Sequence, residues 1–356
     1  MKTTKWATEN LFTLVVGAAI AIGLGLAIQA QMRQNSTSSG SGRQAKAADY
    51  EITGPYTHRN LTVFLIHGSD QTSGKSFLTL QEALDQKKVI VFETKSVNEL
   101  AIQNLSNEDV YVQSGEIVKG GQQDRMLAVD LIVPAKSGKI PIAAFCVESG
   151  RWTKRGSEQS TNFSSSSAVA NTKDLKLAAK VANSQGAVWE NVTVAQDKLS
   201  ANVGARVNST TSESSLQLAV ENAKVQETAN GYTKQLERIV KSGTNVIGYL
   251  FAINGKVNSA DVYASNALFL KLWPKLLKAS AIEAIAEQQQ DLKYEPLSAD
   301  HAKAFLAQSE GGTPSEKAVT TRVKLVTREN KESVFFETQD SADDNAWVHR
   351  NYIKKN

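Results

Sequence analysis

The chain is poor in cysteine and histidine, and both shortages limit its chemistry. Among 356 residues there is one cysteine, Cys146. A single cysteine excludes an intrachain disulfide and a cysteine-based metal site, while the redox compartment stays open. The four histidines are His58, His67, His301 and His349. No two of them stand at ligand spacing, so we expect no metal site, and nothing in the sequence implies a cofactor.

The chain also lacks a block of charge of one sign. Its 40 basic and 36 acidic residues give a formal net charge of +4 that is spread along the sequence. This distribution does not favour nucleic acid as a partner. A hydrophobic content of 41% is enough for a substantial core, and there is no internal repeat.

One long stretch lacks charge altogether, close to the N-terminus. Residues 11–30 follow a short flank (1–10) and hold an apolar or glycine run over 14–28. This length lies between that of a membrane-spanning helix and that of a signal-peptide core. Because no good cleavage site follows closely, we predict an uncleaved transmembrane helix or signal anchor. Residues 31–49 are rich in Ser and Gly and are typical of a flexible linker.

The anchor predicts the membrane as a partner through residues 11–30 and places the folded body outside the cytoplasm. Basic residues on both sides of the span leave a cytoplasmic body as an alternative, and signal cleavage would give a secreted protein. Gly17, Ala21 and Gly25 stand four residues apart, which would let two such helices pack as a homodimer. Alternatively, small residues are simply common in membrane spans.

The remaining residues, 50–356, form the predicted folded domain. Residues 50–152 are β-rich, residues 153–171 form a Ser-rich loop, and residues 172–356 mix helices with strands. The β-rich part predicts strands at 61–66, 89–95, 98–105, 109–115, 126–133 and 139–148. Its one short helix, near 79–86, begins at a T-x-x-E capping box.

The second part has a helical segment, a hairpin, a long helix and a β-rich end. Helical patterns occupy 172–242, and Asn254-Gly255 joins two strands as a tight hairpin turn. A helix capped by Ser265 follows over 265–287, then another over 298–308. Helices and strands segregate along the chain instead of alternating, which favours the α+β class.

Residues 61–84, "LTVFLIHGSDQTSGKSFLTLQEAL", look at first like a phosphate-binding P-loop. That motif needs four residues between its first Gly and Gly-Lys-Ser, whereas Gly68 and Gly74 are separated by five. The capping box also starts the helix after Ser76, too late for a helix N-terminus to meet a phosphate. A nucleoside-triphosphate site is therefore not expected here.

Three stretches resemble a known family. They are "SGEIVKGGQQDRML" (114–127), "IPIAAFCVESGRW" (140–152), and the pair "AVWENV" (187–192) with "FAINGKVNSADVYASNALFLKLWPKLL" (251–277). Together they are similar to the domain named for its association with ADP-ribosylglycohydrolase and rhodanese-phosphatase proteins, over most of residues 55–290. That domain has no assigned function, so the resemblance implies no activity, and its name records neighbours only.

The motifs nevertheless contain candidate site residues. If "GEIVKGGQQDR" and "CVESGRW" lie side by side, they form a polar cluster with one aromatic wall. Its members are Glu116, Gln123, Arg125, Glu148, Arg151 and Trp152. Arginine forks in such a cluster would bind an anion or a sugar-like ligand. Glu116 and Glu148 are candidate catalytic acid and base groups if they face a common space.

Each candidate also has a purely structural interpretation. Glu and Arg beside Gly turns often form loop-fixing salt bridges, and Trp152 would then only seal a core. Cys146 lies in an apolar strand, which is typical of a buried inert thiol. Asp261 precedes a helix start and would serve either a ligand or the cap of that helix.

Two hypotheses therefore stand. The first is a membrane-tethered binding or interaction module with a small-molecule or protein ligand near Glu116–Trp152. The second is an enzyme that acts on an ADP-ribose-like, nucleotide or sugar-phosphate substrate. The enzyme hypothesis requires a pocket shared by both glutamates.

Overall fold

Segments that lie far apart in the sequence build one eight-stranded antiparallel sheet, here called the large sheet. The computed structural model describes residues 46–72, 75–170, 172–241, 243–289 and 293–355. In spatial order the strands are β1 (Glu51–His58), β2 (Leu61–His67), β12 (Val246–Ile253), β13 (Lys256–Tyr263), β17 (Ala346–Lys354), β16 (Ser333–Asp340), β15 (Val323–Glu329) and β14 (Thr313–Ala318).

Burial along the large sheet follows the position of each strand. The central strand β12 is buried at every position, since both of its faces are covered. The edge strand β14 is exposed throughout and carries Pro314, Glu316 and Lys317. Proline and charge on an edge strand discourage pairing with another chain.

Two smaller sheets come from the β-rich part of the chain. The six-stranded sheet has the order β11 (Phe163–Ser164), β7 (Ile117–Gly120), β8 (Arg125–Leu127), β10 (Ile140–Cys146), β5 (Glu99–Asn104) and β4 (Val89–Ser96). The three-stranded sheet has the order β3 (Leu78–Thr79), β6 (Val110–Val112) and β9 (Leu131–Val133).

The prediction of one strand over 126–133 is wrong. The chain leaves the six-stranded sheet after β8 and enters the three-stranded sheet at β9. Asp130 lies in the break, where its carboxylate accepts the Ser114 backbone N–H at 2.8 Å. An acidic residue with long-range partners thus interrupts a β-propensity run that looks continuous in the sequence.

The α-helices of the described residues begin at side-chain caps that are visible in the sequence, and two short 3-10 helices accompany them. They are η1 (Ala47–Asp49), α2 (Leu80–Asp85), α3 (Lys173–Lys180), α4 (Gln185–Val203), α5 (Leu216–Val220), α6 (Ala223–Leu236), η2 (Glu237–Lys241), α7 (Asn266–Ala286) and α8 (Ala299–Ser309). Thr79 and Glu82 form the predicted capping box of α2, and Ser265 caps α7. Asn254 and Gly255 both adopt the positive φ that the predicted hairpin turn requires.

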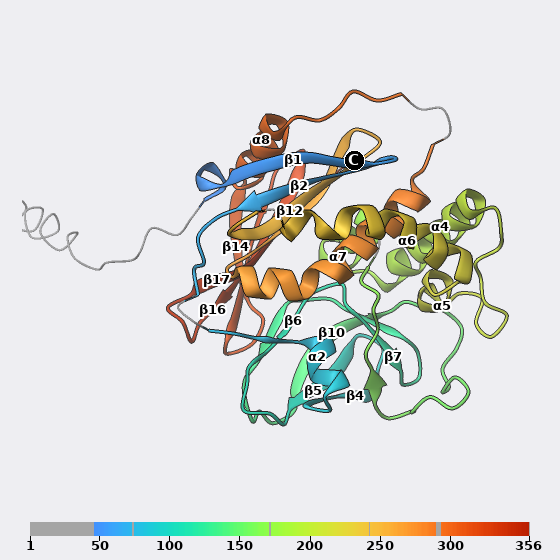
Figure 1. Cartoon of the computed structure of the whole chain (residues 1–356). Helices are drawn as coiled ribbons and strands as arrows, with labels where there is room; N and C mark the ends of the chain where they lie inside the picture. Colours follow the sequence, from blue (N-terminus) through green and yellow to red (C-terminus); the bar gives the residue numbers. More distant parts are fainter. Residues whose placement is uncertain (1–45, 73–74, 171, 242, 290–292, 356) are drawn as a thin grey trace, which may run out of the picture. The chain divides into compact units, whose positions relative to one another are not determined.

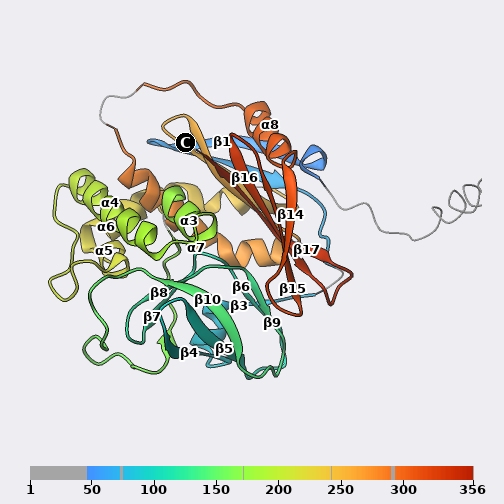
Figure 2. The same cartoon turned by 180° about the vertical axis from the view of Figure 1, so that it is seen from behind.

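The helices cover the two faces of the large sheet differently. In Figures 1 and 2, α7 lies between the large sheet and the smaller sheets, with α4 and α6 beside it, while α8 lies on the opposite face of the large sheet. The larger hydrophobic core fills the α7 side, and a second core with Tyr50, Phe64 and Trp347 fills the α8 side. This arrangement confirms the α+β class and buries α7 on nearly all sides.

The predicted transmembrane segment, residues 11–30, lies outside the described residues, as do Gly17, Ala21 and Gly25. Within the ranges that the structure describes, no helix has both the length and the apolar character needed to cross a membrane.

Candidate functional site

Glu116 forms a buried ion pair with the long helix α7. It stands just before β7 and is 1% exposed. One carboxylate oxygen accepts the Gln113 backbone N–H at 3.0 Å, and the other accepts Lys275 Nζ at 2.6 Å. Both oxygens are therefore engaged in joining the smaller sheets to α7.

Glu148 forms a second ion pair, with different partners. Arg151 donates to its two oxygens at 2.7 Å and 2.6 Å, and the Ser212 hydroxyl donates to one of them. Burial favours the neutral acid, but the hydrogen bonds from Arg151 and Ser212 outweigh it, so the pKa of Glu148 is lowered. Glu148 is thus an ionised, fully engaged carboxylate.

Arg125 is buried completely beneath Trp152. Its guanidinium donates to the Val97 carbonyl at 2.7 Å and contacts the Cys146 sulfur, and Nη2 lies 3.5 Å from Glu93. The Trp152 ring, 42% exposed, covers it with its centre 5.2 Å from the guanidinium carbon. Burial raises the pKa of the Cys146 thiol to about 11, which makes it a poor nucleophile.

A pair that the sequence did not suggest closes this cluster. Arg155, in the Ser-rich loop, donates to both oxygens of Asp124 at 2.9 Å and 3.1 Å and also to Glu158. Its guanidinium lies 3.9 Å from Glu148. We call Asp124, Arg125, Glu148, Arg151 and Arg155 the arginine cluster. The guanidinium groups of Arg151 and Arg155 hold carboxylate partners, whereas Nε and Nη2 of Arg125 are buried without a hydrogen-bond partner among the described residues.

The structure therefore separates the two candidate catalytic glutamates. Glu148 lies in the arginine cluster with Arg125, Arg151 and Trp152, whereas Glu116 is bound to Lys275. Gln123 is buried, at 3% exposed. Neither Glu116 nor Glu148 lines any of four pockets formed by the described residues. This geometry does not favour acid–base hydrolysis by Glu116 and Glu148.

Asp261 lies within β13 and caps no helix, since Ser265 takes that role. The Asp261 carboxylate is 2% exposed and accepts His349 Nε2 at 3.0 Å and Asn351 Nδ2 at 2.9 Å. Burial opposes ionisation, but the bond from His349 prevails and the pKa of Asp261 is lowered. Asp261 is thus a buried anion of the large sheet.

His349 connects Asp261 to Asp130 of the smaller sheets. Its Nδ1 lies 2.7 Å from Asp130, which also accepts the Thr338 hydroxyl at 2.6 Å. Burial acts to lower the pKa of His349, but the two carboxylates raise it above its ordinary value. Because the carboxylates hold opposite ring nitrogens, the three groups do not converge on one point as metal ligands would.

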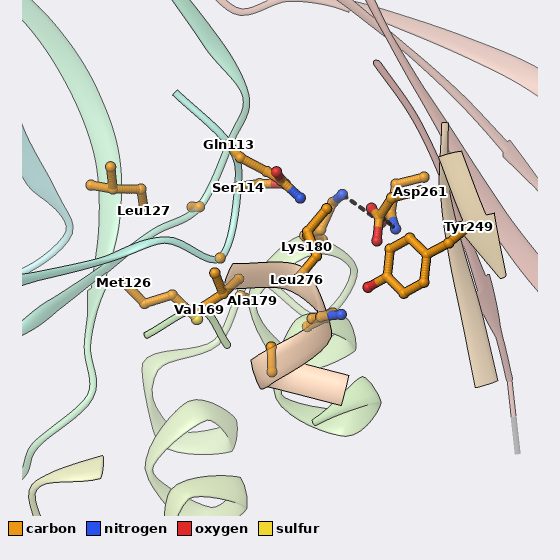
Figure 3. Close-up of a pocket in the computed structure, with 15 residues that line it drawn as sticks. Gln113, Ser114, Met126, Leu127, Val169, Ala179, Lys180, Tyr249, Asp261 and Leu276 are labelled. Carbon is orange, nitrogen blue, oxygen red and sulfur yellow. Dashed lines mark hydrogen bonds between the residues drawn. The ribbon is translucent and has the colours of Figure 1, made fainter. Parts of the chain in front are cut away.

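A small cavity opens beside this row of charges, between the large sheet and the smaller sheets (Figure 3). We call it the interlayer cavity. Its volume is about 20 Å³, room for roughly one water molecule. Gln113 and Met126 lie on one side, Tyr249 and Asp261 on the other, and Lys180 reaches between them.

Two lysines of α3 line the interlayer cavity. Lys176 and Lys180 are one helical turn apart and therefore share a face of the helix. Lys180 Nζ donates to the neutral Asn351 oxygen at 2.9 Å. Burial lowers the pKa of Lys180 to about 8, Asp130 and Asp261 act against that decrease, and the Lys176 cation adds to it.

The profile of the ARG and Rhodanese-Phosphatase-superfamily-associated Protein domain matches residues 49–353. The chain belongs to this family. The resemblance predicted from three motifs is confirmed, and it extends beyond 55–290 to include His349. The chain matches no curated protein and no solved structure.

The sequence did not predict Lys176, Lys180 or His349 as site residues, because each lies in an ordinary secondary-structure pattern. "LKLAAK" is an ordinary amphipathic helix pattern, and "AWVHRNYI" is an ordinary strand pattern. One signal was available, because Lys176 and Lys180 flank Ala178 and Ala179, whose small side chains let α3 approach its neighbours closely. Only the packing shows that both lysines meet a cavity instead of solvent.

Proposed function

We propose that this chain is a membrane-tethered module that binds a small anionic ligand in the interlayer cavity. One observation carries the proposal: Lys176 and Lys180 both line the cavity, and neither has an ion-pair partner within 4.0 Å among the described residues. Buried or partly buried cations are normally paired. Two ammonium groups without an ion pair at one cavity would attract an anion, and the Asp261 carboxylate in the opposite wall offsets part of their charge.

The acidic groups nearby do not remove that potential, because each is held by other donors. Asp261 accepts from His349 and Asn351, and Asp130 accepts from His349 and Thr338. His349 lies between them, and its raised pKa favours the protonated form, which offsets part of their charge. An anion in the cavity would instead meet the ammonium groups of Lys176 and Lys180, the second of which also donates to the neutral Asn351 oxygen.

Neutral groups complete the proposed site. Gln113 uses its amide oxygen to accept from the Tyr263 hydroxyl at 2.8 Å, which leaves its amide NH₂ group for a ligand. Ser114 supplies a hydroxyl in the same wall. The cavity is not fully closed, so a small carboxylate would place one oxygen in the volume of about 20 Å³ while its other atoms lie at the opening.

The arginine cluster is a weaker candidate for this role. The guanidinium groups of Arg151 and Arg155 are engaged with Asp124, Glu148 and Glu158. Displacement of those carboxylates by a ligand would leave them buried and unpaired. Arg125 lies beneath the Trp152 ring. The anion site predicted near Glu116–Trp152 is therefore proposed at the neighbouring interlayer cavity, which keeps Gln113–Ala128 as one wall.

The membrane tether rests on the sequence of residues 11–30, which carries no charged side chain over 20 residues. We propose that it anchors the chain, with the body on the extracytoplasmic side and residues 31–49 as the linker, whose last residues, Ala47–Asp49, form η1 and join the fold. Pairing of two such helices through Gly17, Ala21 and Gly25 belongs to the same proposal.

Isothermal titration calorimetry of the full chain in mild detergent tests the binding proposal, with formate, glyoxylate, inorganic phosphate and ADP-ribose as probes. We expect the small carboxylates to bind and ADP-ribose, which exceeds the cavity, not to bind. Lys176→Gln and Lys180→Gln should each weaken binding by about ten-fold or more, since each removes one charge-assisted contact.

The matched control is Lys224→Gln, on the exposed face of α6. This change should leave the affinities unaltered. Failure of all the small anions to bind would overturn the proposal, and so would equal weakening by Lys224→Gln.

A further inference from the structure

We propose that Arg125, Glu93 and Trp152 form a second binding site, for a sugar ring that carries two neighbouring hydroxyl groups. We call it the Arg125 site. It is separate from the proposed anion site, since the interlayer cavity is lined by other residues. The inference rests on the hydrogen-bonding groups that Arg125 and Glu93 leave open beside one exposed aromatic ring.

Arg125 has one edge of its guanidinium group without a hydrogen-bond partner. Nη1 donates to the Val97 carbonyl at 2.7 Å and contacts the Cys146 sulfur. Nε and Nη2 form the fork that an arginine presents to two neighbouring acceptors, and both are buried without a hydrogen-bond partner among the described residues. Buried N–H groups that stay unpaired are costly, so acceptor atoms of a ligand would stabilise this edge.

Glu93 lies next to this fork without filling it. Its Oε2 is 3.5 Å from Arg125 Nη2, longer than an ordinary hydrogen bond. Two backbone N–H groups hold the carboxylate, that of Lys95 at 3.0 Å from Oε1 and that of Gln122 at 3.1 Å from Oε2. The charge of Glu93 balances that of Arg125, and an anion in the fork would be repelled by Oε2. The fork therefore favours a neutral ligand over an anion.

Together, Arg125 and Glu93 favour hydroxyl groups as partners. A hydroxyl accepts hydrogen bonds through its lone pairs and donates one through its proton. It can therefore accept from Arg125 and donate to Glu93, which neither a carboxylate nor an ammonium group can do. Two neighbouring hydroxyl groups match the two N–H groups of the fork, and sugar rings carry such pairs.

Trp152 supplies the apolar surface that the ring of a sugar needs. Its side chain is 42% exposed, and the centre of its ring lies 5.2 Å from the Arg125 guanidinium carbon. Val97, whose carbonyl accepts from Arg125, is also 42% exposed. Two exposed apolar side chains thus flank the same buried arginine, and the carbon-bound hydrogens of a sugar would pack on the face of the aromatic ring.

A ligand reaches the fork only when the Trp152 ring moves aside, and the surrounding segment allows this movement. The segment is anchored at Ser149, whose backbone bonds to a serine hydroxyl, and at Arg155, which is held in an ion pair. Residues 150–154, between these anchors, belong to no helix or strand. Rotation of the Trp152 side chain would uncover Arg125 without breaking an ion pair, and exposed side chains rotate rapidly.

Saturation-transfer NMR of the full chain in mild detergent tests the site, with D-glucose, D-galactose and D-mannose at millimolar concentrations as probes. We expect at least one of these sugars to bind. Tetrahydropyran, a ring of the same size without hydroxyl groups, should not bind. Maltose beside glucose distinguishes the end of a sugar chain from a free sugar, and binding of either form supports the site. Failure of all the sugars to bind would overturn the proposal.

Two variants connect binding to the Arg125 site. Trp152→Ala should weaken sugar binding by about five-fold or more, because it removes the stacking surface. Arg125→Lys keeps the charge but loses the fork and should weaken binding by about ten-fold or more. Because Arg125 is buried, the exposed Trp152 decides the question if Arg125→Lys does not fold. Unchanged sugar binding in Trp152→Ala would overturn the proposal.

The matched control is Leu105→Ala, which shortens an apolar side chain that is 41% exposed at the far end of β5. It should leave sugar binding unchanged, and equal weakening by this variant would contradict the site. Lys176→Gln and Lys180→Gln should also leave sugar binding unchanged, so the Arg125 site and the proposed function fail independently. Formate binding that Arg125→Lys weakens, in a chain that binds no sugar, would assign the fork to anions and refute the sugar site.

Discussion

His349 Nδ1 lies 2.7 Å from the Asp130 carboxylate, although 219 residues separate the two in the sequence. The contact joins the smaller sheets to the large sheet, and the Thr338 hydroxyl strengthens it from β16. Asp130, His349 and Asp261 thus form a row of alternating charge, here called the interlayer latch, beside the cavity that Lys180 enters.

Asp130→Asn should destabilise the fold strongly. The amide keeps the shape of the side chain but removes the charge that faces His349, and loss of one partner of a buried ion pair costs about 3 to 5 kcal/mol. Thr338→Val removes one hydrogen bond and should cost about 1 kcal/mol. Urea unfolding of the full chain measures both. A loss below 1 kcal/mol for Asp130→Asn would show that the latch does not hold the layers together.

The interlayer latch also predicts a specific dependence of stability on pH. The pKa of His349 is raised in the folded protein, so its contribution is fully present below the unfolded value, about 6.5, and is lost as the pH rises through the folded value. The pKa of Asp130 is lowered, so its contribution is present above about pH 4 and is lost as the pH falls further.

His349→Gln isolates the alkaline part of this behaviour. Lys180 contributes with the opposite sign, because its lowered pKa makes stability increase with pH between about 8 and its ordinary value. The difference in unfolding free energy between the unmodified chain and His349→Gln should therefore be largest near pH 6 and decrease toward pH 9. A constant difference over that interval would contradict protonation of His349 in the fold.

Lys275 and Glu116 should behave as one unit in a double-mutant cycle. Lys275→Met leaves a buried carboxylate unpaired and should cost about 3 to 5 kcal/mol. Addition of Glu116→Gln removes that charge and should recover part of the loss, a coupling of at least about 1 kcal/mol. Additive effects of the two changes would mean that the ion pair does not contribute to stability.

Arg155→Ala should release the Ser-rich loop. Its side chain ties that loop to Asp124, and the backbone of the loop also bonds to Gly121 and Glu93. Hydrogen exchange over residues 156–164 should accelerate by about ten-fold or more as this restraint is lost. Lys154→Ala, at an exposed neighbouring position, is the control. Equal rates of hydrogen exchange in the Arg155→Ala and Lys154→Ala variants would mean that other contacts hold the loop in place.

The proposed membrane tether predicts that the full chain remains with membranes after alkaline carbonate extraction. Ile20→Lys combined with Ile22→Lys places two charges near the centre of the span, at a cost of about 5 to 7 kcal/mol for insertion. That variant should be released, whereas Ile20→Leu with Ile22→Leu should not. Release of the unmodified chain would exclude an integral anchor.

The sequence by itself determined the features that depend on neighbouring residues. Turn and cap preferences act over four residues or fewer, so Asn254-Gly255, the Thr79–Glu82 capping box and the Ser265 cap could be predicted directly. The motifs around Glu116 and Glu148 likewise identified the family. The prediction of one strand over 126–133 was wrong because Asp130, in the middle of that range, forms hydrogen bonds with Thr338 and His349, more than 200 positions away.

Only the tertiary structure decided which charged groups meet. Glu116 and Glu148 lie in motifs that are neighbours in the sequence. In the fold, however, Glu116 forms an ion pair with Lys275 of α7, and Glu148 forms one with Arg151. In the sequence, Lys180 has the pattern of an ordinary solvent-exposed lysine of a helix. Its partial burial beside the interlayer cavity depends on how the large sheet packs against the smaller sheets. The physical reason is that the state of a charge depends on its solvent and its neighbours, and folding sets both by contacts that the local sequence does not contain.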